Sequence, residues 1–447
     1  MSTALEAMGT ERSRNPGGGR IGARRLAASM IIVLTVILPG CSRRGRQPPE
    51  RIILIVVDTL RRDKVSCYET GILTPGIDAL AKRGQIFTNA HAAFHQTTVS
   101  MASLFTGRTP SLESGKGRAS IGWDGATACG LYRFSAAEGR SDCIPRSLPT
   151  LAEQMRRAGY WTIGVTSNAA LYDPNNYSRG FNDWVEIEGK WYGGEKPEQF
   201  KRYTLPAQSR DRGGEAVDAA VSRAVERRPK DRFFLYAHFM DAHDYDANGV
   251  PYEKGVADAD MWVDRMLARL EEAGLLKDSV VVLTADHGER LGESQVVPGT
   301  PFHYGNPSFE QVLWIPLIVS PARFQDASRL IRSDDIFRML ESIAGIADKR
   351  KSDLEPGELF VSEDRYQTYV KGPWKSFRDR SSDREILVNL ETDPGETTNV
   401  AAAHPEVMQA HARRADELAK ALATPPPGEK GFSELQRERL KSLGYVQ

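Results

Sequence analysis

Two apolar runs far apart in the sequence constrain the fold of this chain most. They occupy residues 52–57 and 279–284, and both are rich in valine, isoleucine and leucine without alternating polar positions. This pattern predicts parallel strands that are buried on both faces. Strand-like and helical segments alternate from Arg51 onward, with further strands expected at 161–166 and 233–239. We therefore expect an α/β fold in which helices flank a mostly parallel sheet.

Potential metal ligands stand where the two runs end. Asp58 follows the first run, and Asp286 with His287 follows the second. In open α/β sheets, binding sites form beyond the carboxyl ends of the strands, so we expect these side chains to lie together. Carboxylate oxygens and an imidazole nitrogen can bind one divalent metal ion. Either aspartate alone could be an ordinary turn residue, but the combination with His287 favours a site.

The N-terminal residues have the pattern of a targeting segment. An apolar stretch at 26–39 follows two arginines and is too short to span a bilayer, as is typical of a signal peptide. It leads into Leu-Pro-Gly-Cys, which ends at Cys41 and resembles the lipobox of bacterial lipoproteins. The resemblance implies cleavage before Cys41 and a lipid on its thiol. The alternative is a plain secretory signal with an incidental cysteine.

This pattern sets an expectation for localisation and for the first domain boundaries. We expect a signal peptide at 1–40 and a linker at 41–50. The protein would be exported and anchored by its lipid to the bacterial cell envelope, on the periplasmic side of the inner or outer membrane. Export would permit disulfides. Cys129 and Cys143 flank a polar insert and are expected to pair, although free thiols are an open alternative, and Cys67 has no evident partner.

The amino-acid composition argues against one class of partner, and its change along the chain indicates a domain boundary. The 447 residues carry 59 basic and 59 acidic side chains, and no basic block argues for nucleic acid as a partner. Past about Ala347, charged stretches with glycine and proline separate short strand-like runs, and a helical pattern covers Pro405–Leu422. We expect a catalytic domain at 51–346 and a smaller C-terminal α+β subdomain at 347–447, with a last helix at 432–443.

Several motifs together resemble the sulfatase family of the alkaline phosphatase superfamily. They are Val-Asp-Thr-Leu-Arg at 57–61, Ala-Ser-Leu-Phe-Thr-Gly at 102–107, Asp-His-Gly-Glu at 286–289 and Asn-Leu-Glu-Thr-Asp-Pro-Gly-Glu at 389–396. Each motif alone would be weak, but in combination they are specific. The resemblance covers the chain from Arg51 to the C-terminus, and it implies an alkaline phosphatase-like fold and an ester hydrolase.

The resemblance also implies roles for individual residues. Asp58, Asp286 and His287 match the family's metal ligands, and Thr97 matches the nucleophile, which is also a ligand. His243 matches a histidine that contacts the substrate anion or protonates the leaving group. His303 lies near another active-site histidine position, although its spacing to the following Phe-Glu pair is one residue too long. The ion would be calcium, zinc or manganese, at one site; a second site could use Asp241 with His243.

The departures from the family pattern are as informative as the matches. Sulfatases oxidise a Cys or Ser to formylglycine, and Thr97 cannot undergo that conversion. The motif's Pro and Arg are Val99 and Met101 here, the family's anion-binding Lys segment reads Thr-Ser-Asn-Ala at 166–169, and Thr59 replaces a second Asp. A Thr nucleophile is used instead by the superfamily's phosphodiesterases and phosphoethanolamine or glycerophosphate transferases.

These observations leave three functions. We rank first a metal-dependent hydrolase of phosphate mono- or diesters that acts through Thr97. The second is a sulfuric ester hydrolase that works without formylglycine, and the third is a lipid-anchored binding protein with a degenerate site. The substrate would be a small anionic ester, a glycan or a lipid headgroup.

Other polar residues have ordinary structural explanations. Thr97 or Thr98 could cap a helix that begins near Met101. We expect His238 to pack at a strand end and His95 to be structural. We expect His404 and His411 to be solvated on the C-terminal helix. Arg61 and Arg62 could bind the substrate anion, and the alternative is that they are salt-bridged surface residues.

Overall fold

A computed structural model describes most of the chain beyond the N-terminal segment. It describes residues 47–69, 72–112, 129–135, 143–171, 176–187, 213–227, 232–246, 248–293, 295–296, 302–303, 308–347, 350–363 and 365–423. The predicted signal peptide, Cys41 and the helix expected at 432–443 lie outside these residues. Within the described part, no helix combines the length and the apolar character needed to cross a membrane.

A seven-stranded sheet forms the centre of the fold, in the order β2-β10-β7-β1-β6-β4-β5. The strands from β7 to β5 are parallel, whereas β10 runs antiparallel to both of its neighbours. The bounds are β1 Arg51–Val57, β2 Gln85–Ile86, β4 Trp161–Thr166, β5 Asp183–Glu186, β6 Phe233–Phe239, β7 Ser279–Thr284 and β10 Leu317–Ser320. The mostly parallel α/β fold predicted from the sequence is therefore confirmed.

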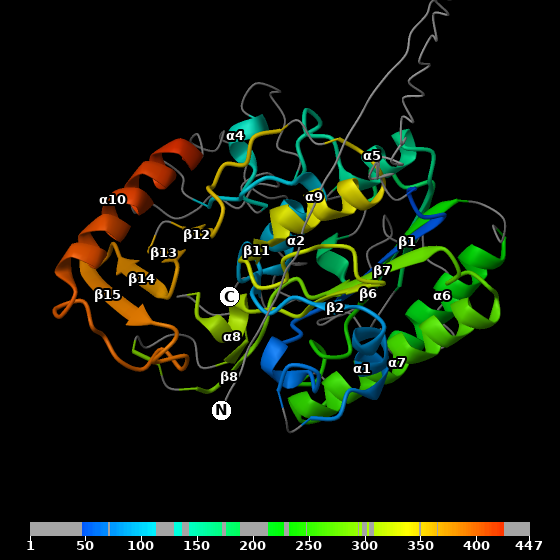
Figure 1. The fold of residues 1–447 in the computed structure, drawn as a ribbon, viewed down its shortest axis with the longest axis horizontal. Helices are drawn as coiled ribbons and strands as arrows, with labels where there is room; N and C mark the ends of the chain where they lie inside the picture. The colour runs from blue at the N-terminus through cyan, green and yellow to red at the C-terminus, as the bar shows by residue number, and fades with distance from the viewer. Residues whose placement is uncertain are drawn as a thin grey trace, which may run out of the picture. The chain divides into compact units, whose positions relative to one another are not determined.

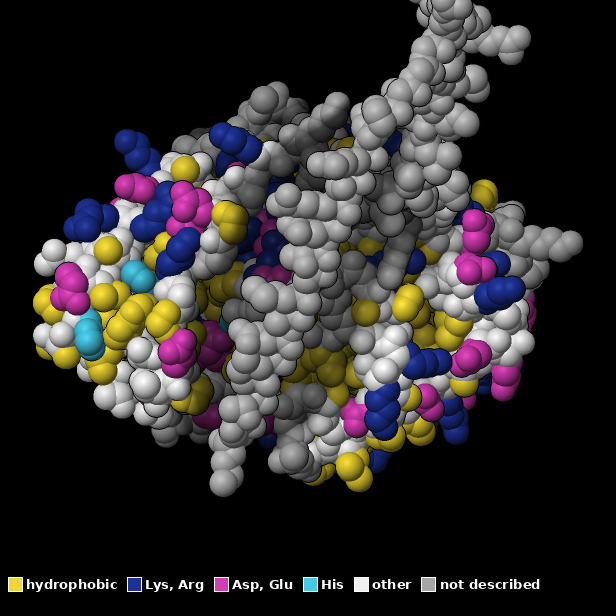
Figure 2. All heavy atoms as spheres, in the orientation of Figure 1, with side chains coloured by type: hydrophobic (Ala, Val, Ile, Leu, Met, Phe, Trp, Pro, Cys, Tyr) yellow, Lys and Arg dark blue, Asp and Glu magenta, His cyan; other side chains and the backbone are white. Residues whose placement is uncertain are grey.

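Helices cover both faces of this sheet (Figure 1). One face carries α1 Pro75–Lys82, α6 Gly214–Glu226 and α7 Tyr252–Glu272, and the other carries α2 Thr97–Thr106, α5 Leu151–Arg157 and α9 Ser333–Ile343. All residues of β6 and β7, and all of β1 after Arg51, are buried, which explains their continuous apolar sequence. Acidic and basic side chains are interspersed on the outer surface over α6 and α7 (Figure 2).

Short elements complete the described catalytic part. They are β3 Ala90–His91 paired with β11 Ile331–Arg332, β8 Arg290–Leu291 paired with β9 Phe302–His303, and the short helices η1 Arg62–Lys64, α4 Tyr132–Ser135, η2 Ala169–Leu171 and α8 Glu310–Leu313. The start of α5 has a capping box, in which Thr150 Oγ1 accepts from Glu153 N and Glu153 accepts from Thr150 N.

The C-terminal part is a separate antiparallel sheet with one long helix. Its strands β12 Glu358–Ser362, β13 Tyr366–Lys371, β14 Trp374–Asp379 and β15 Arg384–Asn389 pair in sequence order, and α10 Pro405–Leu422 packs on them (Figure 1). This confirms the smaller α+β subdomain expected from the sequence. The buried Nζ of Lys375 in β14 lies 2.7 Å from a carboxylate oxygen of Glu310 and 2.8 Å from one of Glu396, which ties the small sheet to α8.

Candidate functional site

The two strand ends predicted to meet do so at the centre of the sheet. β1 pairs directly with β7 in parallel, so Asp58 and Asp286 emerge at the same edge. Donor atoms of Asp58, Asp286 and His287 all lie within 4.8 Å of one another, and all three residues are buried. The structure therefore brings together the three residues that the sequence predicted as metal ligands. Their binding of an ion stays a prediction.

The two oxygens of Asp58 have different surroundings. Oδ2 accepts hydrogen bonds from Asn168 Nδ2 at 2.6 Å and from His238 Nε2 at 2.9 Å. Oδ1 is buried and accepts no hydrogen bond. Burial alone would raise the pKa of Asp58, but the His238 hydrogen bond and the nearby imidazoles of His243, His238 and His287 hold the pKa well below its ordinary value. The carboxylate is therefore ionised, with one oxygen available to a cation.

Asp286 repeats this division between its two oxygens. Oδ1 accepts from the backbone N–H of Thr59 at 3.0 Å and of His287 at 2.8 Å, while the buried Oδ2 accepts no hydrogen bond. Thr59 adopts a left-handed conformation with φ 56°, which is unusual for a β-branched residue. This strained turn points its N–H at Asp286 and thereby orients the carboxylate.

His287 turns one nitrogen toward the two carboxylates. Its Nδ1 donates to the Gly288 carbonyl at 2.7 Å, which leaves the lone pair on Nε2. That Nε2 lies 3.3 Å from Thr97 Oγ1. A side chain at Gly288 would clash, because a Cβ there would lie 2.0 Å from the Gln311 carbonyl oxygen. The glycine thus permits the close backbone approach that holds His287 in place.

Thr97 is the first residue of α2 and is completely buried. The helix begins at Thr97 and not near Met101, and Gln96 is its N-cap residue without a side-chain hydrogen bond, so the expectation of a Thr cap for a later helix was wrong. In this position Thr97 lies at the positive end of a ten-residue helix. Ser100, one turn later, donates from Oγ to the Asp286 carbonyl at 2.6 Å and joins α2 to the end of β7.

This arrangement fits a bound divalent cation. Buried carboxylate oxygens without a hydrogen-bond partner are costly unless another group satisfies them. Asp58 Oδ1 and Asp286 Oδ2 are two such atoms, and they belong to residues that bring donor atoms within 4.8 Å of each other. Together with His287 Nε2 and Thr97 Oγ1 they supply three oxygens and one nitrogen. Each aspartate offers a single oxygen, because hydrogen bonds occupy the other one.

A second metal site finds no support among the described residues. They contain one group of three or more acidic, histidine or cysteine donors within binding distance, namely Asp58, Asp286 and His287. Asp241 uses Oδ1 to accept from Gly214 N at 3.0 Å, at the start of α6. Burial raises its pKa to about 6. Asp241 therefore acts as a cap for α6.

The two other predicted catalytic histidines are His243 and His303, and the structure describes the side chain of His243 alone. The His243 side chain is 17% exposed, and its Nδ1 lies 3.0 Å from Asp244 Oδ1, which orients the ring. Its imidazole is one of the groups that lower the pKa of Asp58. The backbone of His303 pairs with Arg290 in the β8–β9 ribbon, and its side chain lies outside the described part.

Two histidines outside the predicted constellation have defined roles. His238 is packed at a strand end as expected, but it also bonds to Asp58, and its Nδ1 lies 2.6 Å from the hydroxyl of Tyr236. His95 is buried with Nδ1 2.7 Å from Ser308 Oγ, and burial lowers its pKa to about 3. Both Asn168 and His238 thus support Asp58. Asn168 stands in the segment that replaces the family's Lys, which was the sequence signal for it.

Expectations for the surface residues were partly wrong. Arg61 is salt-bridged as expected, to Asp63 and Glu293, although it is only 6% exposed. Arg62 is also salt-bridged, to Glu69 at 3.5 Å, but it is mostly buried, and its guanidinium carbon lies 4.0 Å from the centroid of the Trp314 ring. His411 is not solvated. It is buried under α10, because that helix turns this face toward the small sheet.

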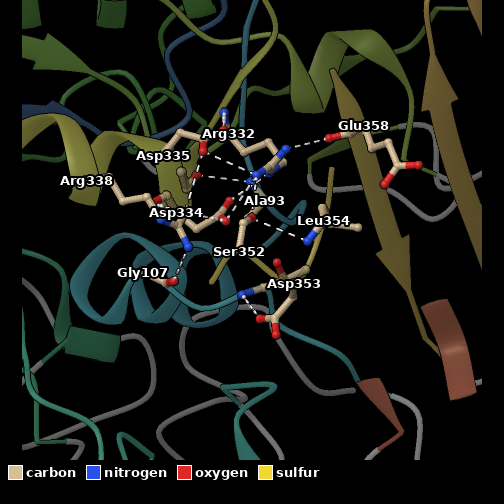
Figure 3. Close-up of polar contacts among 12 residues, drawn as sticks. Ala93, Gly107, Arg332, Asp334, Asp335, Arg338, Ser352, Asp353, Leu354 and Glu358 are labelled. Carbon is tan, nitrogen blue, oxygen red and sulfur yellow. Dashed lines mark hydrogen bonds and ion pairs between the residues drawn. The ribbon is translucent and has the colours of Figure 1, made fainter. Parts of the chain in front are cut away.

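A buried ion network lies behind the site, at the start of α9 (Figure 3). Arg332 Nε lies 3.0 Å from Asp334 Oδ1, and Arg332 Nη1 donates to the Glu358 carbonyl of β12 at 2.8 Å. The adjacent Ser333 accepts from Ala93 N and contacts Ser100 Oγ at 3.2 Å. This path connects the small sheet, through α9 and α2, with the backbone of Asp286.

The chain is similar to a large group of known proteins. The family model described as "Sulfatase" matches residues 50–346. An N-acetylgalactosamine-6-O-sulfatase of Bacteroides thetaiotaomicron is 24% identical over 87% of this chain and 97% of that protein. Among solved structures, a 2-O GAG sulfatase has a TM-score of 0.62 at 16% identity, covering 88% of this chain and 96% of the other. A phosphonate monoester hydrolase of Agrobacterium radiobacter has a TM-score of 0.59 at 16% identity, covering 84% and 96%.

Proposed function

Because this chain belongs to the sulfatase family, we propose that it is a metal-dependent ester hydrolase with Thr97 as its nucleophile, and that its ester is a phosphoryl ester. The observation that carries this proposal is the contact between Thr97 Oγ1 and His287 Nε2, 3.3 Å apart, beside the two unpaired carboxylate oxygens of Asp58 and Asp286. A degenerate binding site would not need this arrangement of ionised carboxylates around a hydroxyl.

The residues of the site would have the following roles in the reaction. Asp58, Asp286, His287 and Thr97 would hold the ion, which when bound neutralises the anionic ester and lowers the pKa of a coordinated hydroxyl. Thr97 would attack the ester centre and carry the covalent intermediate. The N-terminus of α2 would stabilise the negative charge that meets Thr97. His243, oriented by Asp244 at 3.0 Å, would give the departing alkoxide its proton.

The relatives and the nucleophile argue for different esters. The curated relatives and most of the similar structures are named as sulfatases, and on that ground a sulfuric ester is favoured over the phosphate ester that the sequence ranked first. The side chain at the nucleophile favours phosphorus instead, since Thr97 cannot become formylglycine and a sulfated threonine is hard to hydrolyse. The fold is shared with a phosphonate monoester hydrolase. A sulfuric ester is therefore the second candidate.

The number and type of donors favour zinc or manganese over calcium. Calcium takes six to eight oxygen ligands and often uses both oxygens of a carboxylate. Here hydrogen bonds occupy one oxygen of Asp58 and one of Asp286, and an imidazole completes the set. Four donors that include a nitrogen are typical of zinc.

The substrate class proposed here is an anionic ester on a sugar or a lipid headgroup. Relatives named for N-acetylgalactosamine 6-O-sulfate and for glycosaminoglycans support the sugar. The lipobox-like sequence at Cys41 supports a protein that is exported and anchored in the cell envelope, where such esters occur, and the Cys129–Cys143 disulfide agrees with an oxidising compartment. Incorporation of labelled palmitate in the wild type, and its loss in Cys41→Ser, would test the anchor.

Matched nitrophenyl esters test the proposed reaction. The full chain is stripped of metal, supplied with zinc, manganese or calcium, and assayed on nitrophenyl sulfate, phosphate and a phosphate diester. We expect turnover of a phosphoryl ester, loss of about three orders of magnitude or more in Thr97→Ala, and partial recovery in Thr97→Ser, which keeps the hydroxyl. Turnover of the sulfate alone would establish the second candidate. Turnover that survives in Thr97→Ala would overturn the role of Thr97.

A further inference from the structure

The disulfide between Cys129 and Cys143 lies against a single buried hydroxyl group. The hydroxyl oxygen of Tyr177 is 3.5 Å from the sulfur of Cys129 and 3.7 Å from that of Cys143. The same hydroxyl donates a hydrogen bond of 2.5 Å to the carbonyl of Thr98. Thr98 directly follows Thr97 in the first turn of α2. A covalent crosslink is thus one side chain away from the proposed nucleophile.

Tyr177 is held so that its hydroxyl cannot move away from Thr98. It has no exposed surface, and its ring packs edge-on against Phe105 of α2, with ring centroids 5.7 Å apart. Hydrogen bonds fasten the residues on both sides of it to the segment after Cys143. Asn176 Nδ2 donates to the Ile144 carbonyl at 3.5 Å, and Arg179 Nη1 donates to the Pro145 carbonyl at 3.1 Å.

The other half of the disulfide is fastened to a different part of the chain. The carbonyl of Gly130, next to Cys129, accepts a hydrogen bond from Ser111 N at 3.0 Å. Leu112 N in turn donates to the Ser362 carbonyl at the end of β12. The disulfide therefore joins two separately anchored segments beside Tyr177, and Cys129, Cys143 and Tyr177 are all buried.

We propose that the Cys129–Cys143 disulfide and Tyr177 form a strut that positions the nucleophile, with Tyr177 as a positioning residue. The inference rests on the proposed function, in which Thr97 attacks the ester. A nucleophile must be held within a small fraction of an ångström of its reactive geometry, so a fixed neighbouring carbonyl has a direct effect on rate. Burial raises the pKa of the Tyr177 hydroxyl well above its ordinary value, so the hydroxyl keeps the proton that it donates to Thr98.

Reduction would release one side of this strut. A phosphine reductant breaks the S–S bond, delivers two electrons to the sulfurs and becomes the phosphine oxide by taking its oxygen from water, and two protons complete the two thiols. The sulfurs are then no longer held at bonding distance behind the hydroxyl. Turnover should therefore depend on the oxidation state of this pair.

The test compares the full chain with Tyr177→Phe, which removes only the hydroxyl, and with the double variant Cys129→Ser, Cys143→Ser. Tyr160→Phe is the matched control, because Tyr160 is also buried and donates to a backbone carbonyl, that of Pro49 at 2.9 Å, remote from Thr97. Each protein is assayed with and without phosphine at constant metal concentration. Two kinds of measurement are made: the kinetic constants kcat and KM, and the hydrogen exchange of the α2 amides at 98–101.

In Tyr177→Phe, in the double variant and in the reduced wild type, we expect kcat to fall roughly tenfold with KM changed less than about twofold. Exchange at 98–101 should rise in the same three proteins, and Tyr160→Phe should change neither quantity. Phosphine should have no further effect on Tyr177→Phe, since the two groups act as one unit.

Two results would overturn the strut. One is a reduced wild type with unchanged exchange at 98–101, and the other is a Tyr177→Phe protein that phosphine slows as much as the wild type. A wild type that hydrolyses none of the esters would refute the proposed function alone, because hydrogen exchange would still decide whether the disulfide and Tyr177 hold the start of α2.

Discussion

The Nε2 nitrogen of His238 lies 2.9 Å from Oδ2 of Asp58, and the two residues are buried side by side at the ends of adjacent strands. The hydroxyl of Tyr236 is 2.6 Å from the other ring nitrogen of His238, so a neutral imidazole can accept from Tyr236 and donate to Asp58. This chain of hydrogen bonds occupies Oδ2 and turns Oδ1 toward Asp286 and His287. Groups that orient a ligand in this way strongly affect metal affinity.

His238→Phe should weaken metal binding by roughly 10- to 100-fold, because Asp58 loses a hydrogen bond that orients it. His238→Gln, which keeps an N–H donor, should lose less. The affinity is measured by calorimetric titration of metal-stripped protein with zinc, so the result does not depend on turnover. His404→Gln is the control, because His404 is a histidine at the start of α10, beside Trp374 and away from the site. An unchanged affinity in His238→Phe would show that Asp58 is oriented without it.

The choice of metal should be visible in thermal stability. Zinc or manganese at about 100 times its Kd should stabilise the metal-stripped chain by about 2.7 kcal/mol, whereas calcium at the same concentration should have little effect. The reason is the donor set, in which two carboxylates offer one oxygen each beside the nitrogen of His287. Asp286→Asn should abolish the shift in melting temperature. A shift with calcium alone would contradict the four-donor interpretation.

Local patterns were sufficient to predict that three polar side chains meet at the strand ends. Asp58, Asp286 and His287 were predictable because continuous apolar runs indicate parallel strands, and neighbouring parallel strands end at one edge. The groups that support them were harder to identify. Asn168 and His238 lie 110 and 180 positions from Asp58, so their contacts exist only once β6 has paired with β1 and β4 has paired with β6.

The sequence led to two wrong expectations, on the start of α2 and on the burial of His411. The Thr-Thr-Val run at 97–99 has weak helix propensity, so the sequence suggested a helix start near Met101, yet burial against the sheet extends α2 to Thr97. His411 was expected in solvent because α10 is rich in charged residues. Only the docking of that helix on β13 and β14 reveals that this position faces Tyr369 and Ser376.

Removal of Arg332 should strongly destabilise the protein. Arg332→Met leaves the buried carboxylate of Asp334 with fewer partners and removes a hydrogen-bond donor from the Glu358 carbonyl (Figure 3). We expect the free energy of unfolding to fall by about 3 kcal/mol. Arg365→Met is the control, since the Arg365 side chain is 60% exposed in its pair with Asp379 and should contribute at most about 0.5 kcal/mol. Urea unfolding at neutral pH measures both. Equal costs for the two variants would show that the network behind α9 contributes no special stability.

Acid should destabilise the chain through His411. Burial lowers the pKa of His411 to about 4, so between pH 6.5 and 4 the unfolded chain binds a proton there that the folded chain does not. The free energy of unfolding therefore falls as the pH falls. His411→Gln should reduce the loss between pH 7 and pH 5 by about 1 kcal/mol. Identical pH dependence in wild type and variant would show that His411 titrates normally in the folded protein.

Glu396 should change the free energy of unfolding in the opposite direction over nearly the same pH range. Burial raises its pKa to about 7, and the nearby charge of Glu310 opposes the effect of Lys375, which the two carboxylates share. Between pH 4.5 and 7 the folded chain holds a proton on Glu396 that the unfolded chain has released, so stability present at low pH is lost as the pH rises through 7.

Glu396→Gln keeps the size of the side chain and removes this titration. The variant should therefore lose less stability than the wild type when the pH is raised from 5 to 8, whereas His411→Gln should differ from the wild type in the acid range. Unfolding curves at several pH values for the wild type, each variant and the double variant separate the two opposing slopes. The effects should add in the double variant, because the two residues share no hydrogen-bond partner. A wild type and Glu396→Gln with parallel curves from pH 5 to 8 would show that Lys375 keeps both carboxylates ionised.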